Sequence, residues 1–140
     1  MEAKATLVTG VIGDDVHVTG IRVLEHALRK AGFTVVALGV QVSQQQFIEA
    51  AIESKADALL VSSLGGHARP ACEGLKQKCD EAGLKDIRLY IGGMLMSGGS
   101  SWEETEKTFK EMGFDRAYPP FTMPAPILAD LETDFTKKRG

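Results

Sequence analysis

The sequence predicts an α/β fold built on a doubly wound, five-stranded parallel sheet. Three observations support this prediction. Short apolar segments rich in β-branched residues alternate with segments whose apolar residues recur at helical spacing. Glycines stand where several of the helical segments end, as C-cap residues do. The length of 140 residues suits one domain with a real core, so residues 1–140 are expected to form a single domain.

The expected strands are short, and glycine or proline closes several of them. The first covers residues 6–12 and stops at Gly13, and its run of apolar residues is typical of a strand buried on both faces. The fourth runs into Gly92 and Gly93. The five segments are 6–12, 34–38, 58–62, 87–91 and 116–118. Right-handed crossovers in a chain of this size favour the flavodoxin-like (Rossmann-like) strand order 2-1-3-4-5.

The expected helices lie between these strands. The first has apolar residues at helical spacing and ends at Gly32. The second begins after Ser43, an N-cap residue, and carries one apolar face formed by Phe47, Ile48, Ala51 and Ile52. Three more helices are expected near residues 71–82, 102–112 and 124–135.

The composition narrows the classes of function. Hydrophobic residues make up 44% of the chain and charged residues 25%, which is typical of a globular protein. The net charge of −3 provides no basic surface for nucleic acid. No apolar run approaches the roughly 20 residues that span a bilayer, and no signal peptide is visible. We therefore expect a cytoplasmic protein without a membrane segment, with Cys72 and Cys79 as reduced thiols.

The fold predicts where a ligand binds. Open parallel sheets bind ligands beyond the carboxyl ends of their strands, at the point where the strand order reverses. Here that point lies between the first and third strands. The loops to inspect are residues 13–20, 62–70 and 92–101, and all three are rich in glycine and polar residues.

Three common functions of this fold match these loops poorly. A flavoprotein that binds the flavin phosphate would have a loop rich in serine and threonine after the first strand, but Asp14 and Asp15 stand there instead, and carboxylates repel phosphate. A phospho-acceptor domain uses such an acidic pair, but also needs an aspartate after the third strand and a lysine after the fifth. Serine and proline occupy those places. The glycine fingerprint of dinucleotide-binding proteins is absent.

The loop after the first strand contains a candidate metal ligand. Asp15 and His17 stand two residues apart, and Gly20 opens the next helix. A histidine that binds a metal usually donates its other ring N–H to a carboxylate, so an Asp-x-His pair supplies both groups. Glycine at the helix start leaves room for a flat ligand. By itself this pattern also occurs by chance.

The combination of three motifs is far more specific. Asp15-x-His17-x-x-Gly20, Ser62-x-Leu64 and Gly92-Gly93 are together the marks of base-off/His-on cobalamin-binding domains. The chain further resembles the small (sigma) subunits of the glutamate mutase (methylaspartate mutase) family along nearly its whole length. This closer resemblance rests on segments 11–13, 50–53, 55–57, 61–64, 78–85 and 112–116.

The resemblance implies a role for each motif residue. His17 would be the lower axial ligand of cobalt and Asp15 its hydrogen-bond partner, with Val16 between them at the cofactor. The cofactor's dimethylbenzimidazole tail would leave the cobalt and enter a slot beside the sheet. The residues expected to line the slot or make room for the tail are Gly20, Ser62, Leu64, Gly92 and Gly93.

The resemblance also implies the reaction. The family uses adenosylcobalamin (coenzyme B12) to interconvert L-glutamate and (2S,3S)-3-methylaspartate by radical chemistry, so the complex would be an isomerase. The substrate site would lie on a large epsilon-type barrel subunit, in a heterotetramer of two small and two large subunits. This chain alone would be inactive. In agreement, Arg69 is the only arginine in the expected ligand-facing loops.

Two other functions remain open at this stage. A corrinoid methyl-carrier protein of a methyltransferase system shares the histidine motif, although such proteins usually have a helical domain ahead of it, and the first strand here is expected to begin near residue 5. A non-catalytic B12 carrier or sensor would lack a substrate site as well.

Overall fold

A computed structural model of the chain describes residues 4–13, 19–64, 68–95, 101–119 and 122–139. Its five strands form one parallel sheet in the order β2-β1-β3-β4-β5, which confirms the predicted topology. The strands are β1 (Thr6–Val11), β2 (Thr34–Ala37), β3 (Ala58–Leu64), β4 (Arg88–Met94) and β5 (Arg116–Ala117).

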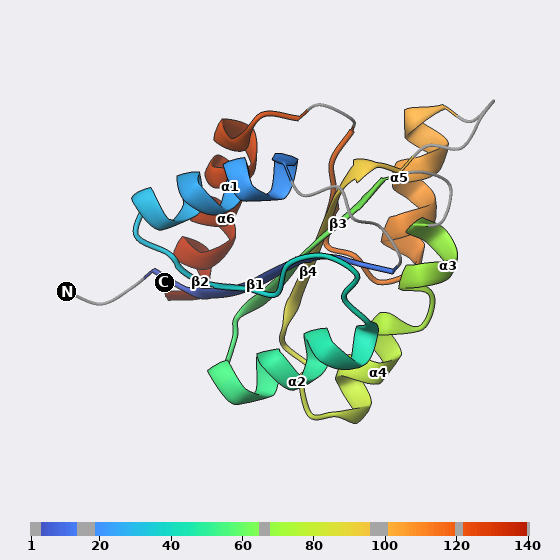
Figure 1. Cartoon of the computed structure of the whole chain (residues 1–140), viewed down its shortest axis with the longest axis horizontal. Coiled ribbons are helices and arrows are strands. Elements are labelled where there is room, and N and C mark those ends of the chain that lie inside the picture. Colours follow the sequence, from blue (N-terminus) through green and yellow to red (C-terminus); the bar gives the residue numbers. More distant parts are fainter. Residues whose placement is uncertain (1–3, 14–18, 65–67, 96–100, 120–121, 140) are drawn as a thin grey trace.

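Two layers of helices enclose the sheet. Figure 1 shows α1 and α6 together on one face and α2 to α5 on the other. The helices are α1 (Thr19–Lys30), α2 (Gln44–Ser54), α3 (Ala68–Cys72), α4 (Leu75–Glu81), α5 (Trp102–Glu111) and α6 (Pro124–Arg139).

The alternation of side chains along the strands divides the core into two clusters. Val8 and Leu89 pack with the helices α2 to α5. Leu7, Leu60 and Tyr90 pack with α1 and α6. Because both faces are covered, the central strands read as continuous apolar runs in the sequence.

The helix predicted near residues 71–82 is in fact two helices, so that prediction was wrong. α3 ends at Cys72, and α4 begins at Leu75. Gly74 between them has φ +82°, a conformation that no α-helix can continue through. Cys72 and Cys79 therefore lie on different helices, and both are buried free thiols.

The second helix begins as predicted. The Ser43 hydroxyl accepts a hydrogen bond from the Gln46 backbone N–H, and the Gln46 side chain accepts one from the Ser43 N–H. Phe47, Ile48 and Ala51 are buried, but Ile52 is 50% exposed. The prediction for Ile52 was wrong because it lies about 90° from the centre of the buried face, at 100° per residue.

The third and fourth strands are longer than predicted. Their ladder continues through the pairs Ser62–Gly92, Ser63–Gly93 and Leu64–Met94. The motif residues that were predicted to follow these strands therefore belong to the last residues of the strands themselves. This places them in a fixed register rather than in loops.

Candidate cofactor-binding site

The described residues among the predicted site residues come from the start of α1 and from the carboxyl ends of β3 and β4. Asp15, Val16 and His17 lie outside the described residues. Gly20 is the second residue of α1. The backbone of Leu64 ends β3, where it pairs with Met94.

The sheet forms one wall of a cavity of about 410 Å³ next to α1 and α6. Its lining includes Leu60 and Ser62 on β3, and Tyr90, Gly92 and Gly93 on β4. Leu60 and Ser62, like Tyr90 and Gly92, are two residues apart and so point to the same face. The structure thus brings four of the predicted residues, Gly20, Ser62, Gly92 and Gly93, to one cavity.

The opposite wall is made by α1. Gly20, Ile21, Val23 and Leu24 line the cavity from this side. A Cβ at Gly20 would have no atom within 4 Å, so glycine leaves this part of the wall open. Val23 is 53% exposed and lines the cavity where it opens to solvent.

A contact deep in the fold holds α1 against the sheet. The buried Thr9 hydroxyl on β1 donates a hydrogen bond of 2.5 Å to the carboxylate of Glu25, which is 6% exposed. A buried carboxylate requires such a partner. This pair therefore orients the helix that forms the α1 wall.

Sequence reasoning missed the third wall, which comes from the C-terminal part of the chain. Tyr118, Met123, Pro124 and Ile127 line the cavity. Met123 is 68% exposed at the rim. Strand periodicity could have identified Tyr90, which is two residues before Gly92, but no local pattern pointed to the start of α6.

Four residues that line the cavity carry hydroxyl groups: Ser62, Tyr90, Tyr118 and Thr122. The two tyrosine hydroxyls donate to aspartates of α6. The Ser62 hydroxyl has no hydrogen-bond partner among the described residues. The hydroxyl of Thr122 donates to the Pro119 carbonyl oxygen at 2.6 Å. The cavity therefore offers one free hydroxyl within largely apolar walls, an arrangement typical of small-molecule sites.

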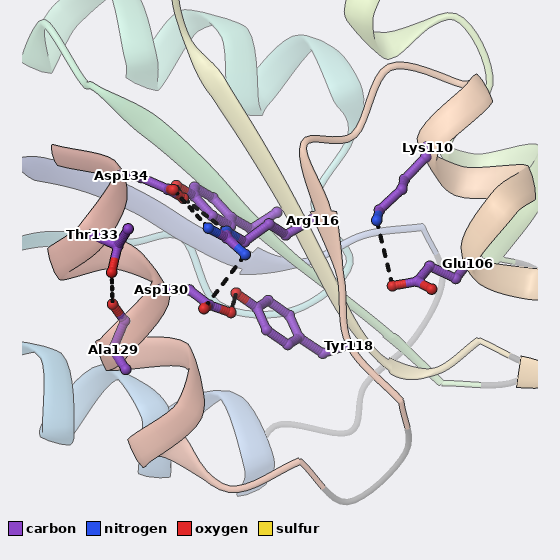
Figure 2. Close-up of polar contacts among 9 residues, drawn as sticks. Glu106, Lys110, Arg116, Tyr118, Ala129, Asp130, Thr133 and Asp134 are labelled. Atoms are coloured by element: carbon purple, nitrogen blue, oxygen red, sulfur yellow. Dashed lines mark hydrogen bonds and ion pairs between the residues drawn. The ribbon is translucent and has the colours of Figure 1, made fainter. Parts of the chain in front are cut away.

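Five side chains connect α6 to the sheet behind the cavity, and we call them the α6 anchor: Tyr90, Arg116, Tyr118, Asp130 and Asp134. Figure 2 shows Arg116 between the two aspartates of α6, with Tyr118 donating to Asp130. The Arg116 guanidinium binds both oxygens of Asp134, at 2.8 and 2.9 Å. Tyr90 donates to Asp134 at 2.5 Å.

The α6 anchor shifts the pKa values of its members. Hydrogen bonds from Arg116 lower the pKa of Asp134. Burial raises the pKa of Tyr90 and of Tyr118, and their hydrogen bonds to the aspartates raise it further. The aspartate therefore stays ionised and the phenols stay neutral donors near pH 7.

Comparison of the sequence with a family model and with known relatives shows the family to which the chain belongs. Residues 5–115 match the model of the B12 binding domain. The glutamate mutase sigma subunit of Clostridium tetani (strain Massachusetts / E88) is 53% identical over 135 residues, which cover 96% of this chain and 98% of the relative. This chain belongs to the B12-binding glutamate mutase sigma-subunit family. The sigma subunit 2 of Haloarcula marismortui is also 53% identical, over 92% of this chain and 86% of that relative.

Solved structures agree with the fold of a sigma-family chain. A cobalamin-binding protein from Desulfitobacterium hafniense DCB-2 has a TM-score of 0.74 at 19% identity, over 91% of this chain and 58% of that chain. The monomethylamine corrinoid protein of Methanosarcina barkeri has a TM-score of 0.74 at 24% identity, with the same coverage. The chain thus spans little more than half of these two proteins. A response regulator from Burkholderia multivorans, at 14% identity, has a TM-score of 0.59, so the fold alone does not specify the function.

Proposed function

We propose that this chain is the cobalamin-binding subunit of a glutamate mutase that interconverts L-glutamate and (2S,3S)-3-methylaspartate. The observation that carries the proposal is the position of Ser62, Gly92 and Gly93 on one cavity, in a chain 53% identical to sigma subunits of that enzyme. When bound, adenosylcobalamin supplies radical chemistry through its weak cobalt–carbon bond. The whole chain acts as one binding domain.

The cavity fits the nucleotide tail of cobalamin. Its volume of about 410 Å³ is at the lower end of the roughly 300–1,000 Å³ of small-molecule sites. It suits a base with its ribose rather than a whole corrinoid. Leu60, Tyr90 and Ile127 provide apolar surface for a bicyclic base, and the Ser62 hydroxyl provides one hydrogen bond.

The histidine motif provides the second point of attachment. His17 would hold the cobalt, Asp15 would accept a hydrogen bond from its other ring N–H, and Val16 would lie beside the cofactor. This assignment rests on the spacing of the motif and on its position in the sequence, between β1 and Gly20, the motif residue that lines the cavity. Asp15 would then orient the imidazole and strengthen it as a ligand. Leu64, at the end of β3, would border the tail near Ser62.

The substrate is expected to bind to a separate large subunit. The relatives are named as sigma subunits, which implies a partner. Two carboxylates of a substrate call for arginine or lysine side chains, and the described residues lining the cavity include neither. We propose an epsilon-type barrel subunit, with two small and two large subunits in the complex, located in the cytoplasm. Within the described residues, no helix is long and apolar enough to cross a membrane.

The cobalt ligand can be tested by EPR. The chain is produced with ¹⁵N-labelled histidine, loaded with adenosylcobalamin and converted to the Co(II) form. Hyperfine coupling that changes with the label identifies a histidine nitrogen, whereas coupling from the cofactor's own base would not change. The coupling should disappear in His17→Gly and persist in His26→Ala, whose histidine is exposed on α1. Label-independent coupling would contradict the proposal.

The reaction can be tested by reconstitution. The chain, adenosylcobalamin and a large subunit are mixed with L-glutamate, and methylaspartate is measured. Activity is expected only when all components are present. Activity of this chain alone would contradict the proposed division of roles, and cobalamin binding without activity alongside large subunits would favour a carrier or sensor.

A further inference from the structure

The start of the C-terminal helix forms one wall of the cavity, but it lies beyond the residues that match the B12 binding domain. The match covers residues 5–115, and α6 begins at Pro124. Met123, Pro124 and Ile127 line the cavity. The width of the cavity therefore depends on where this helix sits relative to the sheet.

Two carboxylates on α6 hold the helix in place. Asp130 and Asp134 are four residues apart, so they lie on the same side of the helix. Asp134 accepts a bidentate pair of hydrogen bonds from Arg116 on β5. A carboxylate oxygen of Asp130 lies 3.4 Å from a nitrogen of the same guanidinium. A bidentate pair between arginine and a carboxylate fixes the relative orientation of the two side chains as well as the distance between them.

The same carboxylates fix the two tyrosines on the sheet side of the cavity. Tyr90 donates to Asp134 at 2.5 Å, and Tyr118 donates to Asp130 at 2.9 Å. Both tyrosines line the cavity and are nearly buried, at 1% and 8% exposure. A helix wall and two aromatic side chains therefore share one set of hydrogen bonds.

We propose that Arg116, Asp130 and Asp134 are positioning residues that set the width of the cavity and hence its affinity for the nucleotide tail of the cofactor. This inference rests on the proposed function. Arg116, Asp130 and Asp134 do not line the cavity themselves. The two carboxylates instead hold the tyrosine rings and the start of α6 at the distance that encloses a flat base.

A purely structural role would have different consequences. If the α6 anchor only stabilised the fold, its loss would lower the free energy of unfolding and weaken every ligand alike. If it positions the cavity wall, its loss weakens only ligands that carry the tail. Adenosylcobinamide, which has the corrin and the adenosyl group but no nucleotide tail, separates the two cases.

The experiment compares dissociation constants for adenosylcobalamin and adenosylcobinamide, measured by spectrophotometric titration of the full chain. The variants are Tyr118→Phe, Asp130→Asn and Asp134→Asn. Two controls remove polar contacts that do not reach the tyrosines (Figure 2). Thr133→Ala removes a hydrogen bond to the Ala129 carbonyl on α6, and Glu106→Gln removes an ion pair with Lys110 on α5. Circular dichroism and urea unfolding verify that each variant is folded.

We expect each anchor variant to bind adenosylcobalamin about tenfold more weakly, because the start of α6 and the tyrosine rings are then no longer held in the position that encloses the tail. Adenosylcobinamide should change by less than about twofold on the same energy scale, and the controls should match the wild type. If cobinamide binding is too weak to measure in every form, the unfolding data decide: weaker cobalamin binding by anchor variants whose free energy of unfolding matches that of the wild type, with the controls unchanged, supports the inference, and weaker binding only in destabilised variants overturns it.

Three other results would overturn it. Equal losses for both ligands would assign the α6 anchor to stability alone. Unchanged cobalamin affinity in folded variants would mean that the α6 anchor does not influence the cavity. The proposed function would still stand in that case, provided that the wild type binds cobalamin more tightly than cobinamide. A wild type without that preference would contradict the tail site itself. If Asp134→Asn does not fold, Tyr118→Phe and Asp130→Asn decide the outcome.

Discussion

A Cβ atom at Gly93 on β4 would lie 2.1 Å from the carbonyl oxygen of Ser63 on β3. These two residues are register partners in the ladder. Gly93 also has φ +107°, where side chains are strained. Its neighbour Gly92 differs, because a Cβ there would meet only the Tyr118 Cβ, at an ordinary 3.7 Å. The two glycines of the motif are thus needed for different reasons.

The first prediction contrasts the two glycines. Gly93→Ala should destabilise the fold without any cofactor, by at least the roughly 1–3 kcal/mol of backbone strain and more through the clash. Gly92→Ala should change the free energy of unfolding by less than about 1 kcal/mol, but weaken cobalamin binding by filling the cavity. Urea unfolding and cobalamin titration measure these effects. A stable Gly93→Ala protein would show that β3 and β4 separate more easily than their register implies.

The second prediction concerns the buried pair that holds α1. Thr9→Val keeps the side-chain shape but leaves the Glu25 carboxylate without its hydroxyl donor. The free energy of unfolding should fall by about 1–3 kcal/mol. Thr9→Ser retains the hydroxyl and serves as the control. Urea unfolding of both variants provides the measurement, and equal stability of the two would mean that the hydrogen bond contributes nothing.

The third prediction concerns the two cysteines. Both side chains are fully buried. Burial raises the pKa of the Cys72 thiol to about 12 and that of Cys79 to about 11. Because the thiolate is the reactive form, neither thiol should react quickly with an alkylating or disulfide reagent at pH 8. Both should react at once in denaturant. Rapid labelling of a folded sample would contradict the burial of these residues.

The fourth prediction is a pH dependence of stability. The pKa of Asp134 is lowered by folding, so its contribution to stability is present above its ordinary value of 3.8 and is lost as the pH falls through the lower folded value. The pKa of Tyr118 is raised, so its contribution is complete below the ordinary value of 10.0 and declines as the pH rises above it.

Urea midpoints measured across the pH range check both directions. We expect the midpoint to fall below about pH 4 and above about pH 10. Asp134→Asn should flatten the acid side, and Tyr118→Phe should flatten the alkaline side. Thr133→Ala, on the same helix, should reproduce the wild-type profile. A variant profile parallel to that of the wild type would mean that the altered residue does not contribute to the pH dependence.

Local patterns were sufficient for the strand order, because alternating strands and helices with right-handed crossovers allow few arrangements. They were not sufficient for the helix predicted near residues 71–82. Its interruption depends on Gly74 at φ +82°, and a glycine in a helical pattern can be either tolerated or a break. The exposure of Ile52 was missed for a similar reason, since a residue at the edge of an apolar face is buried only if a neighbour covers it.

The sequence by itself determined the topology, the motif residues at the carboxyl edge of the sheet, and the family resemblance that the relatives confirm. The tertiary structure decided what completes the cavity. Tyr90 and Asp134 are 44 residues apart in the chain, and Ser63 and Gly93 are 30 apart. Such contacts arise only when strands adopt their register and helices pack on the sheet, and no periodicity within one segment encodes them.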